Sequence, residues 1–114
     1  MFFDMSRYSC YVAPGVTDMR RGDLSLSRLV RDSMEMDPTS RSMFLFCSRN
    51  RKTLCVLVWD NGFWLMKKRI VLGTFAWPRD GSEALLITLE DVRRLVRGDD
   101  VFRKIPSIPE GAVI

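Results

Sequence analysis

The chain has 114 residues, of which 46% are hydrophobic and 28% are charged. These proportions indicate a soluble, globular chain with a single core rather than a disordered one. Its 18 Lys and Arg residues outnumber 14 Asp and Glu residues, and the net charge of +4 mildly favours an anionic partner such as nucleic acid. The chain contains no histidine, which excludes a Ser-His-Asp triad, an imidazole general base and a Cys2His2 zinc site.

The cysteines and the hydrophobic runs indicate where the protein resides. Cys10, Cys47 and Cys55 are odd in number and lack CxxC spacing, so we expect reduced, buried thiols. The first four residues, MFFD, do not resemble a signal peptide, and no run approaches the roughly 20 apolar residues of a membrane span. We therefore expect a cytoplasmic protein without membrane association.

The first third of the chain predicts a strand followed by a helix. We expect residues 1–8 to be a flexible lead-in and residues 9–12 to form a short strand that ends at Pro14-Gly15. Asp18 and Asp23 are candidate caps for a helix over residues 24–35, which must end before Asp37-Pro38. This helix is predicted from apolar residues at helical spacing: Leu26, Leu29, Val30 and Met34.

The middle of the chain predicts β-hairpins. Strands are expected over residues 43–48, 54–59, 63–69 and 74–77, because β-branched and aromatic residues dominate these runs. With Asn61-Gly62 as a two-residue type I′ turn, the hairpin register follows. It places Trp59 opposite Trp64, Val58 opposite Leu65, Leu57 opposite Met66, Cys55 opposite Lys68 and Leu54 opposite Arg69.

The last third predicts a second helix and a tail. After a turn at residues 79–82, Thr88 and Asp91 approximate a capping box for a helix over residues 89–97 that Gly98 ends. Residues 99–114 are expected to be an extended tail. The fold class is therefore α+β: a small antiparallel β-meander of about four to five strands packed with two helices, forming a single domain over residues 9–98.

Basic residues are expected to gather at the open end of the hairpins. The loop of residues 49–52 would lie beside Lys67, Lys68 and Arg69, so that six cations share one edge of the sheet. Such an edge is either a solvated rim that discourages edge-to-edge pairing or a surface that binds phosphates.

Aromatic residues are interleaved with these cations, a mixture that single-strand-binding surfaces also use. We expect Phe44, Phe46, Trp59 and Trp64 to belong to the core, and Trp59 and Trp77 to be buried structural residues. Both faces of the sheet are apolar in sequence. Either helices cover both sides or one side meets a partner.

Asp18, Asp37 and Asp60 each lie at the edge of a predicted element, and their convergence would make a divalent-metal site for phosphoryl transfer. Each also has a simpler local role in a cap or turn, so a metal nuclease is the least favoured hypothesis. No phosphate-binding glycine loop, nucleophile elbow or metal-spaced cysteine cluster is present. We expect no catalytic residue, metal site or cofactor.

Several short motifs occur together in this chain: GVTDMRRG at residues 15–22, Asp37-Pro38, Leu45-Phe46, WDNGF at residues 59–63, Lys68-Arg69 and GTFAWP at residues 73–78. In this order and spacing, over residues 10–97, the sequence resembles the TnpB-type accessory proteins of the insertion sequence sixty-six family. The resemblance implies a small bacterial protein that acts in transposition beside a separate, larger transposase of the same element.

Two functions are compatible with this sequence. The first is a nonenzymatic accessory factor in DNA transposition that contacts DNA phosphates through Arg20, Arg21, Arg49, Arg51, Lys52, Lys67, Lys68 and Arg69. The alternative is an adaptor that docks the transposase or associates with its own copy, without direct DNA binding.

Overall fold

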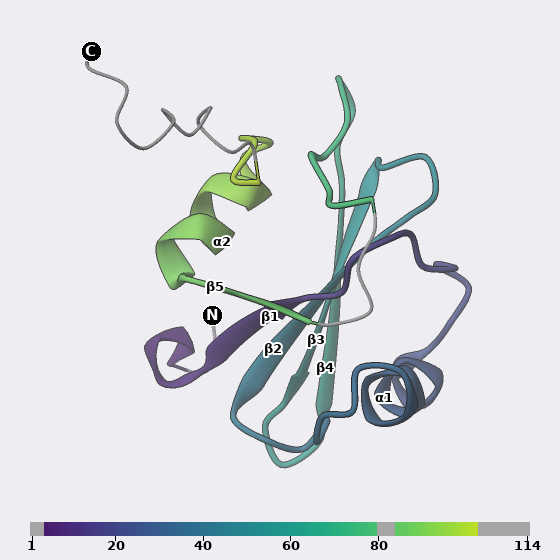
Figure 1. Ribbon diagram of the computed structural model, residues 1–114, viewed down its shortest axis with the longest axis vertical. Coiled ribbons are helices and arrows are strands. Elements are labelled where there is room, and N and C mark those ends of the chain that lie inside the picture. Colours follow the sequence, from purple (N-terminus) through teal and green to yellow (C-terminus); the bar gives the residue numbers. More distant parts are fainter. Residues whose placement is uncertain (1–3, 80–83, 103–114) are drawn as a thin grey trace, which may run out of the picture.

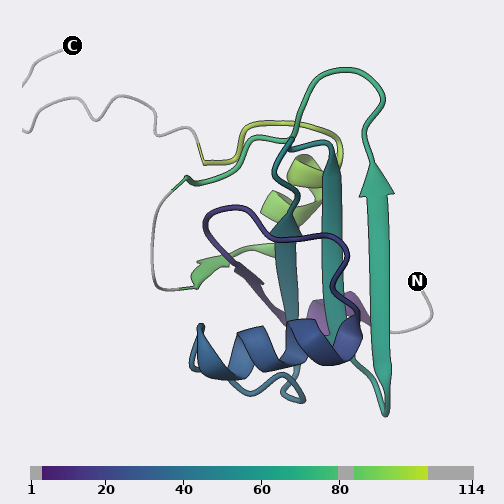
Figure 2. The ribbon, with the colours of Figure 1, turned by 90° about the vertical axis from the view of Figure 1, so that its right-hand side faces the viewer.

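The computed structural model describes residues 4–79 and 84–102 of the chain. In this part, five strands form one sheet in the order β4-β3-β2-β1-β5. Helix α1 lies on one face of the sheet and α2 on the other (Figures 1 and 2). The α+β class is therefore confirmed. The elements are η1 (Met5–Arg7), β1 (Ser9–Val12), α1 (Asp23–Asp32), β2 (Ser42–Cys47), β3 (Thr53–Trp59), β4 (Phe63–Arg69), β5 (Leu85–Ile87) and α2 (Leu89–Val96).

The sheet is mixed rather than a purely antiparallel meander. Strands β2, β3 and β4 are antiparallel neighbours as predicted, and β5 is antiparallel to β1. Strand β1, however, runs parallel to β2. The physical reason is the connection between them, because parallel neighbours need a long crossover and α1 lies between these two strands in the chain.

The predicted register of the β3–β4 hairpin is wrong by one residue. Trp59 pairs with Phe63, so the loop contains Asp60, Asn61 and Gly62 instead of two residues. Asn61 and Gly62 have φ angles of 52° and 149°, and the backbone N–H of Asp60 donates to the carbonyl of Gly62 at 2.7 Å. Because side chains alternate along a strand, this shift places every β4 side chain on the opposite face from the predicted one. The corrected pairs include Val58 with Trp64, Leu57 with Leu65, Val56 with Met66, Cys55 with Lys67 and Leu54 with Lys68.

The strand predicted over residues 74–77 does not form, and the fifth strand is β5. Residues 74–77 cross the end of the sheet, where the N–H of Phe75 donates to the carbonyl of Arg51 at 2.7 Å. Phe75 and Trp77 are nevertheless buried. Their aromatic character thus reflects burial in the core and not membership of a ladder. The three residues of β5 were too short a run to stand out in the sequence.

The second helix agrees with its sequence signals better than the first. At the start of α2, Thr88 Oγ1 accepts from the N–H of Asp91 at 3.0 Å and Asp91 Oδ2 accepts from the N–H of Thr88 at 3.1 Å, which confirms the capping box. Helix α1 has Gly22 at its N-cap, so neither Asp18 nor Asp23 caps it. It also ends at Asp32, earlier than predicted, and Glu35 follows with a φ of 53° that helices do not accommodate.

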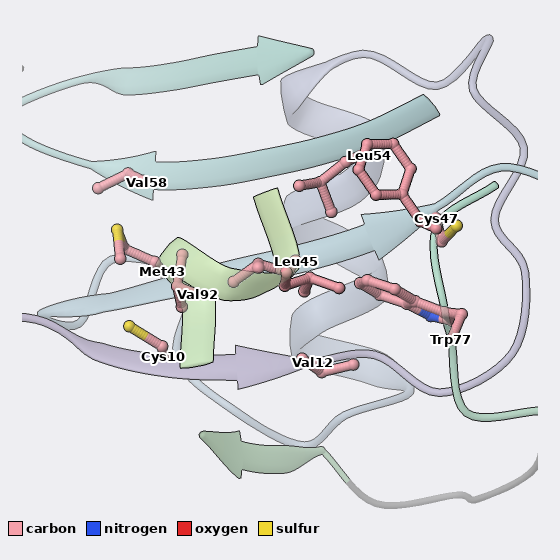
Figure 3. Close-up of a cluster of buried hydrophobic side chains, with 11 residues drawn as sticks. Cys10, Val12, Met43, Leu45, Cys47, Leu54, Val58, Trp77 and Val92 are labelled. Carbon is pink, nitrogen blue, oxygen red and sulfur yellow. The ribbon is translucent and has the colours of Figure 1, made fainter. Parts of the chain in front are cut away.

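The sheet separates two cores, and one helix lies on each apolar face. The core on the α1 side consists of Ala13, Leu26, Val30, Phe44, Phe46, Cys55 and Leu57. The core on the α2 side, shown in Figure 3, consists of Cys10, Val12, Met43, Leu45, Cys47, Leu54, Val58, Phe75, Trp77, Val92 and Leu95.

The predictions for cysteine and aromatic side chains are mostly confirmed. The three cysteines are buried free thiols. Phe44, Phe46 and Trp77 are buried as expected. Trp59 is only half-buried and lies outside both cores, packed against Phe63 with ring centroids 4.9 Å apart, so its predicted burial in the core is wrong. Trp64 is 39% exposed, so its expected place in the core is wrong.

The predicted terminal segments are partly visible. Residues 5–7 form the single 3-10 turn η1, and the hydroxyl of Tyr8 donates to the carbonyl of Trp59 at 3.1 Å. At the other end, Phe102 packs edge-on against Trp77. Residues 103–114 of the predicted tail and most of the predicted turn over residues 79–82 lie outside the described residues. The domain limits therefore stay a prediction.

Candidate nucleic-acid interface

The structure brings together two of the basic segments that the sequence singled out. The N–H of Ile70 donates to the carbonyl of Lys52 at 2.8 Å, and Thr53 pairs with Arg69. The loop between β2 and β3 therefore lies beside the end of β4, as the hairpin arrangement predicts.

The three lysines do not form a shared basic edge. Lys67 extends toward the α1 side, where its ammonium donates to the carbonyl of Met19 at 2.9 Å. Lys68 extends toward the α2 side and donates to the carbonyl of Val96 at 2.8 Å. Lys52 donates to the carbonyl of Gly73 at 2.9 Å. The prediction of six cations on one edge is thus wrong, because adjacent strand residues point to opposite faces.

Arg20 and Arg21 are held by local contacts before helix α1. The guanidinium of Arg20 forms a fork with Asp18, with Nη2 at 2.8 Å from Oδ2 and Nε at 3.0 Å from Oδ1. These bonds lower the pKa of the Asp18 carboxyl below its usual range. Arg21 Nη1 donates to the hydroxyl of Ser25 at 3.1 Å. The Arg20 side chain remains 92% exposed despite its ion pair.

Four arginines from three segments of the chain line two adjoining hollows at one end of the sheet. Arg20 and Arg49 line a hollow of about 540 Å³, and Arg49, Arg51 and Arg79 line a second of about 310 Å³. We call Arg20, Arg49, Arg51 and Arg79 the arginine end. No hydrogen bond or ion pair joins the side chain of Arg49, Arg51 or Arg79 to another described residue.

The backbone fixes the segments that carry these arginines. The N–H of Thr17 donates to the carbonyl of Cys47 at 2.8 Å, which places the loop after β1 beside the end of β2. The N–H of Gly15 donates to the carbonyl of Pro78 at 2.8 Å. Trp77 Nε1 donates to the carbonyl of Ala13 at 2.9 Å. The GVTDMRRG and GTFAWP motifs, far apart in sequence, therefore meet at the arginine end.

Arg79 was not among the residues proposed from sequence. It follows Trp77-Pro78 directly, and it reaches the arginine end only because Pro78 bonds to Gly15 across the fold. No local sequence signal marks this contact.

The three aspartates considered as a metal site each have a local partner. Asp18 binds Arg20, Asp37 Oδ1 accepts from the N–H of Thr39 at 2.9 Å, and Asp60 Oδ2 lies 3.5 Å from Trp64 Nε1. The backbone bond from Thr39 lowers the pKa of Asp37. In residues 4–79 and 84–102, no three Cys, Asp or Glu side chains gather in a way that could hold a metal ion.

The arrangement at the arginine end is suited to contacting anions.

Fold and surface together define a small α+β protein with an arginine-lined end formed by three loops. The family described as "IS66 Orf2 like protein" matches residues 8–105. The chain therefore belongs to this family of insertion-sequence proteins, which associates it with transposition. It is also 33% identical over 92 residues, 79% of each chain, to "Uncharacterized protein y4hO" of Sinorhizobium fredii (strain NBRC 101917 / NGR234). No solved structure matches the chain.

In the part of the chain that the structure describes, no helix is long and apolar enough to cross a membrane.

Proposed function

We propose that this protein is a nonenzymatic accessory factor in the transposition of an insertion element and that it contacts DNA phosphates through the arginine end. The observation that carries the proposal is the gathering of Arg49, Arg51 and Arg79 around one hollow, with exposed side chains that have no partner among the described residues. Family membership supports the role in transposition.

Guanidinium groups are well suited to this task. A planar guanidinium donates two parallel hydrogen bonds to a phosphate and stays charged at every physiological pH. Side chains that already pair with carboxylates would have to break those pairs, whereas Arg49, Arg51 and Arg79 would not. Phosphate contacts position a protein on DNA without reading sequence, so the proposal implies binding with little sequence preference.

The other cations proposed from sequence have a supporting role. Arg69 has an exposed side chain, whereas Arg20, itself part of the arginine end, is held in a fixed orientation by Asp18. An ammonium has three donors, and Lys52, Lys67 and Lys68 each use one on a backbone carbonyl. Those lysines and Arg21 retain positive charge that attracts DNA at longer range.

The test is binding of the full chain to a fluorescein-labelled DNA duplex, followed by fluorescence anisotropy over a range of salt concentrations. If the four arginines each contact a phosphate, the association constant should fall with salt at a log-log slope of about 3 to 4. The triple variant Arg49→Gln, Arg51→Gln, Arg79→Gln should bind more weakly at low salt and lose about 3 units of this slope.

A matched variant controls for net charge. Arg28, Arg31 and Arg41 are also exposed but lie away from the arginine end, so their triple substitution by Gln removes the same charge. This control should keep most of the affinity and slope. Equal losses in the two triple variants, or no binding of the wild type at low salt, would show that the arginine end is not a DNA-contacting surface.

Docking of a protein partner is a second candidate function, and exposed apolar residues favour it. Val71 and Leu72 are each 85% exposed in the loop after β4, and Leu86 on the edge strand β5 is 66% exposed. Large apolar side chains exposed to this degree are typical of surfaces that meet another protein. The transposase of the same element is the expected partner. Pull-down with that transposase tests this role, and light scattering tests self-association.

A further inference from the structure

An apolar groove lies on the α2 side of the sheet, away from the arginine end. Its volume is about 380 Å³, and its apolar lining comes mainly from Met5, Met43, Leu54, Val56, Met66 and Val92. This volume falls within the range of about 300 to 1,000 Å³ that is typical of ligand pockets. The groove lies between α2 and the strands β3 and β4.

The groove exists because the two helices are placed differently on their faces. Helix α1 contacts β3 and β4 on its side, whereas α2 contacts β1 on the other side. The part of the second face formed by β3 and β4 is therefore only partly covered by α2, which borders it through Val92, Arg93 and Val96 (Figure 1). Figure 3 shows Met43, Leu54 and Val58 on this face, with Val92 of α2 above it.

The side chains that line the groove favour a helical occupant. Three of the lining residues are methionines, whose unbranched and polarizable side chains adjust to the shape of an inserted surface. An amphipathic helix that lies in an apolar groove buries side chains at positions i, i+3, i+4 and i+7. Such a helix would lie over β3 and β4 beside α2 and complete the second face, as α1 does on the first.

The charges at the rim indicate the chemistry of the occupant. The basic residues of the lining are Lys67 and Lys68 on the β4 side and Arg93 on the α2 side, and the lining contains no acidic residue. Lys68 donates to Val96 at the end of α2. Arg93 is 67% exposed and lies 3.6 Å from Glu90, an exposed pair that contributes little to stability and can exchange partners. Carboxylates flanking an apolar helix face would complement these cations.

We propose that the groove binds an amphipathic helix of a partner protein, with an apolar face flanked by Glu or Asp. This interaction is independent of DNA contact at the arginine end, because the two surfaces share no residue. The protein could therefore bind a partner in the groove while the arginine end contacts DNA.

The probe is a synthetic peptide of about 15 residues, long enough to form a helix, with Leu at positions i, i+3, i+4 and i+7 and Glu on both flanks. Binding is followed by NMR of protein labelled with ¹³C in the methionine methyl groups. The methyl signals of Met5, Met43 and Met66 should shift, while those of Met19, Met34 and Met36, which pack on the α1 side, should not. Circular dichroism should show that the bound peptide is helical.

Two protein variants and a second peptide test the groove and its charge. Met66→Glu, in the half-buried part of the lining, should abolish binding, whereas Leu24→Glu, at a 62% exposed position of α1 on the other side of the sheet, should leave it unchanged. Arg93→Glu, which alters an exposed side chain and should stay folded, should weaken binding of the Glu peptide by about tenfold and improve binding of the same peptide with Lys in place of Glu.

Several results would overturn the proposal. These are no binding at millimolar peptide, shifts confined to the α1-side methionines, a bound peptide that is not helical, or equal affinity for the Glu and Lys peptides. Concentration-dependent shifts of Met5, Met43 and Met66 without peptide would assign the groove to a second copy of the chain instead. The triple arginine variant should bind the peptide normally, so a failed DNA assay and a failed peptide assay are distinguishable.

Discussion

Trp77 links the core on the α2 side to the loop that carries the arginine end. It is 7% exposed, and its Nε1 donates to the carbonyl of Ala13 at 2.9 Å. Trp77→Phe keeps most of the apolar contact but leaves the buried carbonyl of Ala13 without its donor. The free energy of unfolding should therefore fall by about 1 to 3 kcal/mol. The measurement is urea unfolding followed by circular dichroism.

Trp59→Phe is the comparison for this prediction. Trp59 is half-buried, and no hydrogen bond joins its ring nitrogen to another described residue. This variant should change the free energy of unfolding by about 0.5 kcal/mol or less. If the two substitutions have the same effect, the bond from Trp77 to Ala13 does not stabilise this end of the sheet.

The buried thiols should be chemically inert in the folded protein. Burial raises the pKa of Cys47 and of Cys55 to about 11 from an ordinary value of 9.0. The thiolate is the reactive form, so native protein at pH 8 should react very slowly with Ellman's reagent, and all three cysteines should react after unfolding. Rapid reaction of the native protein would show that this part of the core opens readily.

The same shift makes stability depend on pH in the alkaline range. Because the folded pKa of Cys47 lies above the unfolded one, its contribution to stability is complete below pH 9 and is lost as the pH rises toward 11. The unfolding free energy of the wild type minus that of Cys47→Ala should therefore fall between pH 9 and pH 11. Groups common to both proteins cancel in this difference, and a constant difference would contradict the assignment.

At the scale of elements, the capping box of α2 makes a prediction about helix stability. The Thr88 hydroxyl satisfies the N–H of Asp91, which would otherwise lack a partner in the first turn. Thr88→Ala should destabilise the protein by about 1 kcal/mol, whereas Thr88→Ser, which keeps the acceptor, should have an effect of a few tenths of a kcal/mol. Thermal or denaturant unfolding of the two variants measures the loss of stability. Equal losses would mean that the hydrogen bond accepted by the Thr88 hydroxyl does not stabilise α2.

The β3–β4 hairpin shows how one loop residue decides the position of a charge. A two-residue loop would have put Lys67 on the α2 side and Lys68 on the α1 side. With Asp60 in the loop, Lys67 instead reaches Met19 and Lys68 reaches Val96 at the end of α2. The Asn-Gly signal identified the hairpin correctly. It did not fix the loop length, because Asn61 and Gly62 provide positive φ angles in loops of either length.

At the scale of the whole molecule, the sheet separates two cores, and substitutions in one core should affect stability independently of substitutions in the other. Val30 of α1 and Val92 of α2 are both buried, on opposite faces. Val30→Ala and Val92→Ala should each destabilise the protein by about 1.6 kcal/mol, because each removes two buried methyl groups. The double variant should equal the sum to within about 0.5 kcal/mol, since the two sites share no neighbours.

Urea unfolding of the two single variants and the double variant measures the coupling. Wild type and the three variants should share one m-value, so that the comparison of free energies holds. A coupling free energy above about 1 kcal/mol would mean that packing on one face of the sheet depends on packing on the other, so that the two cores are not independent.

The sequence by itself determined the elements with strong local signals. These include the continuous apolar runs of β2 and β3, the hairpin at Asn61-Gly62, the capping box of α2 and the burial of the three cysteines. It also determined the family, because motifs in a fixed order persist whatever the register between strands. Each of these properties depends on residues close together in the chain or on residue type alone.

Only the tertiary structure decided the parallel pairing of β1 with β2, the faces on which Lys67 and Lys68 lie, and the meeting of Arg79 with Arg49 and Arg51. These features depend on long-range backbone bonds such as that from Gly15 to Pro78. Local propensity and periodicity contain no information on such bonds, because their formation depends on how complete elements pack. The offset of α2 that leaves the apolar groove open has the same origin.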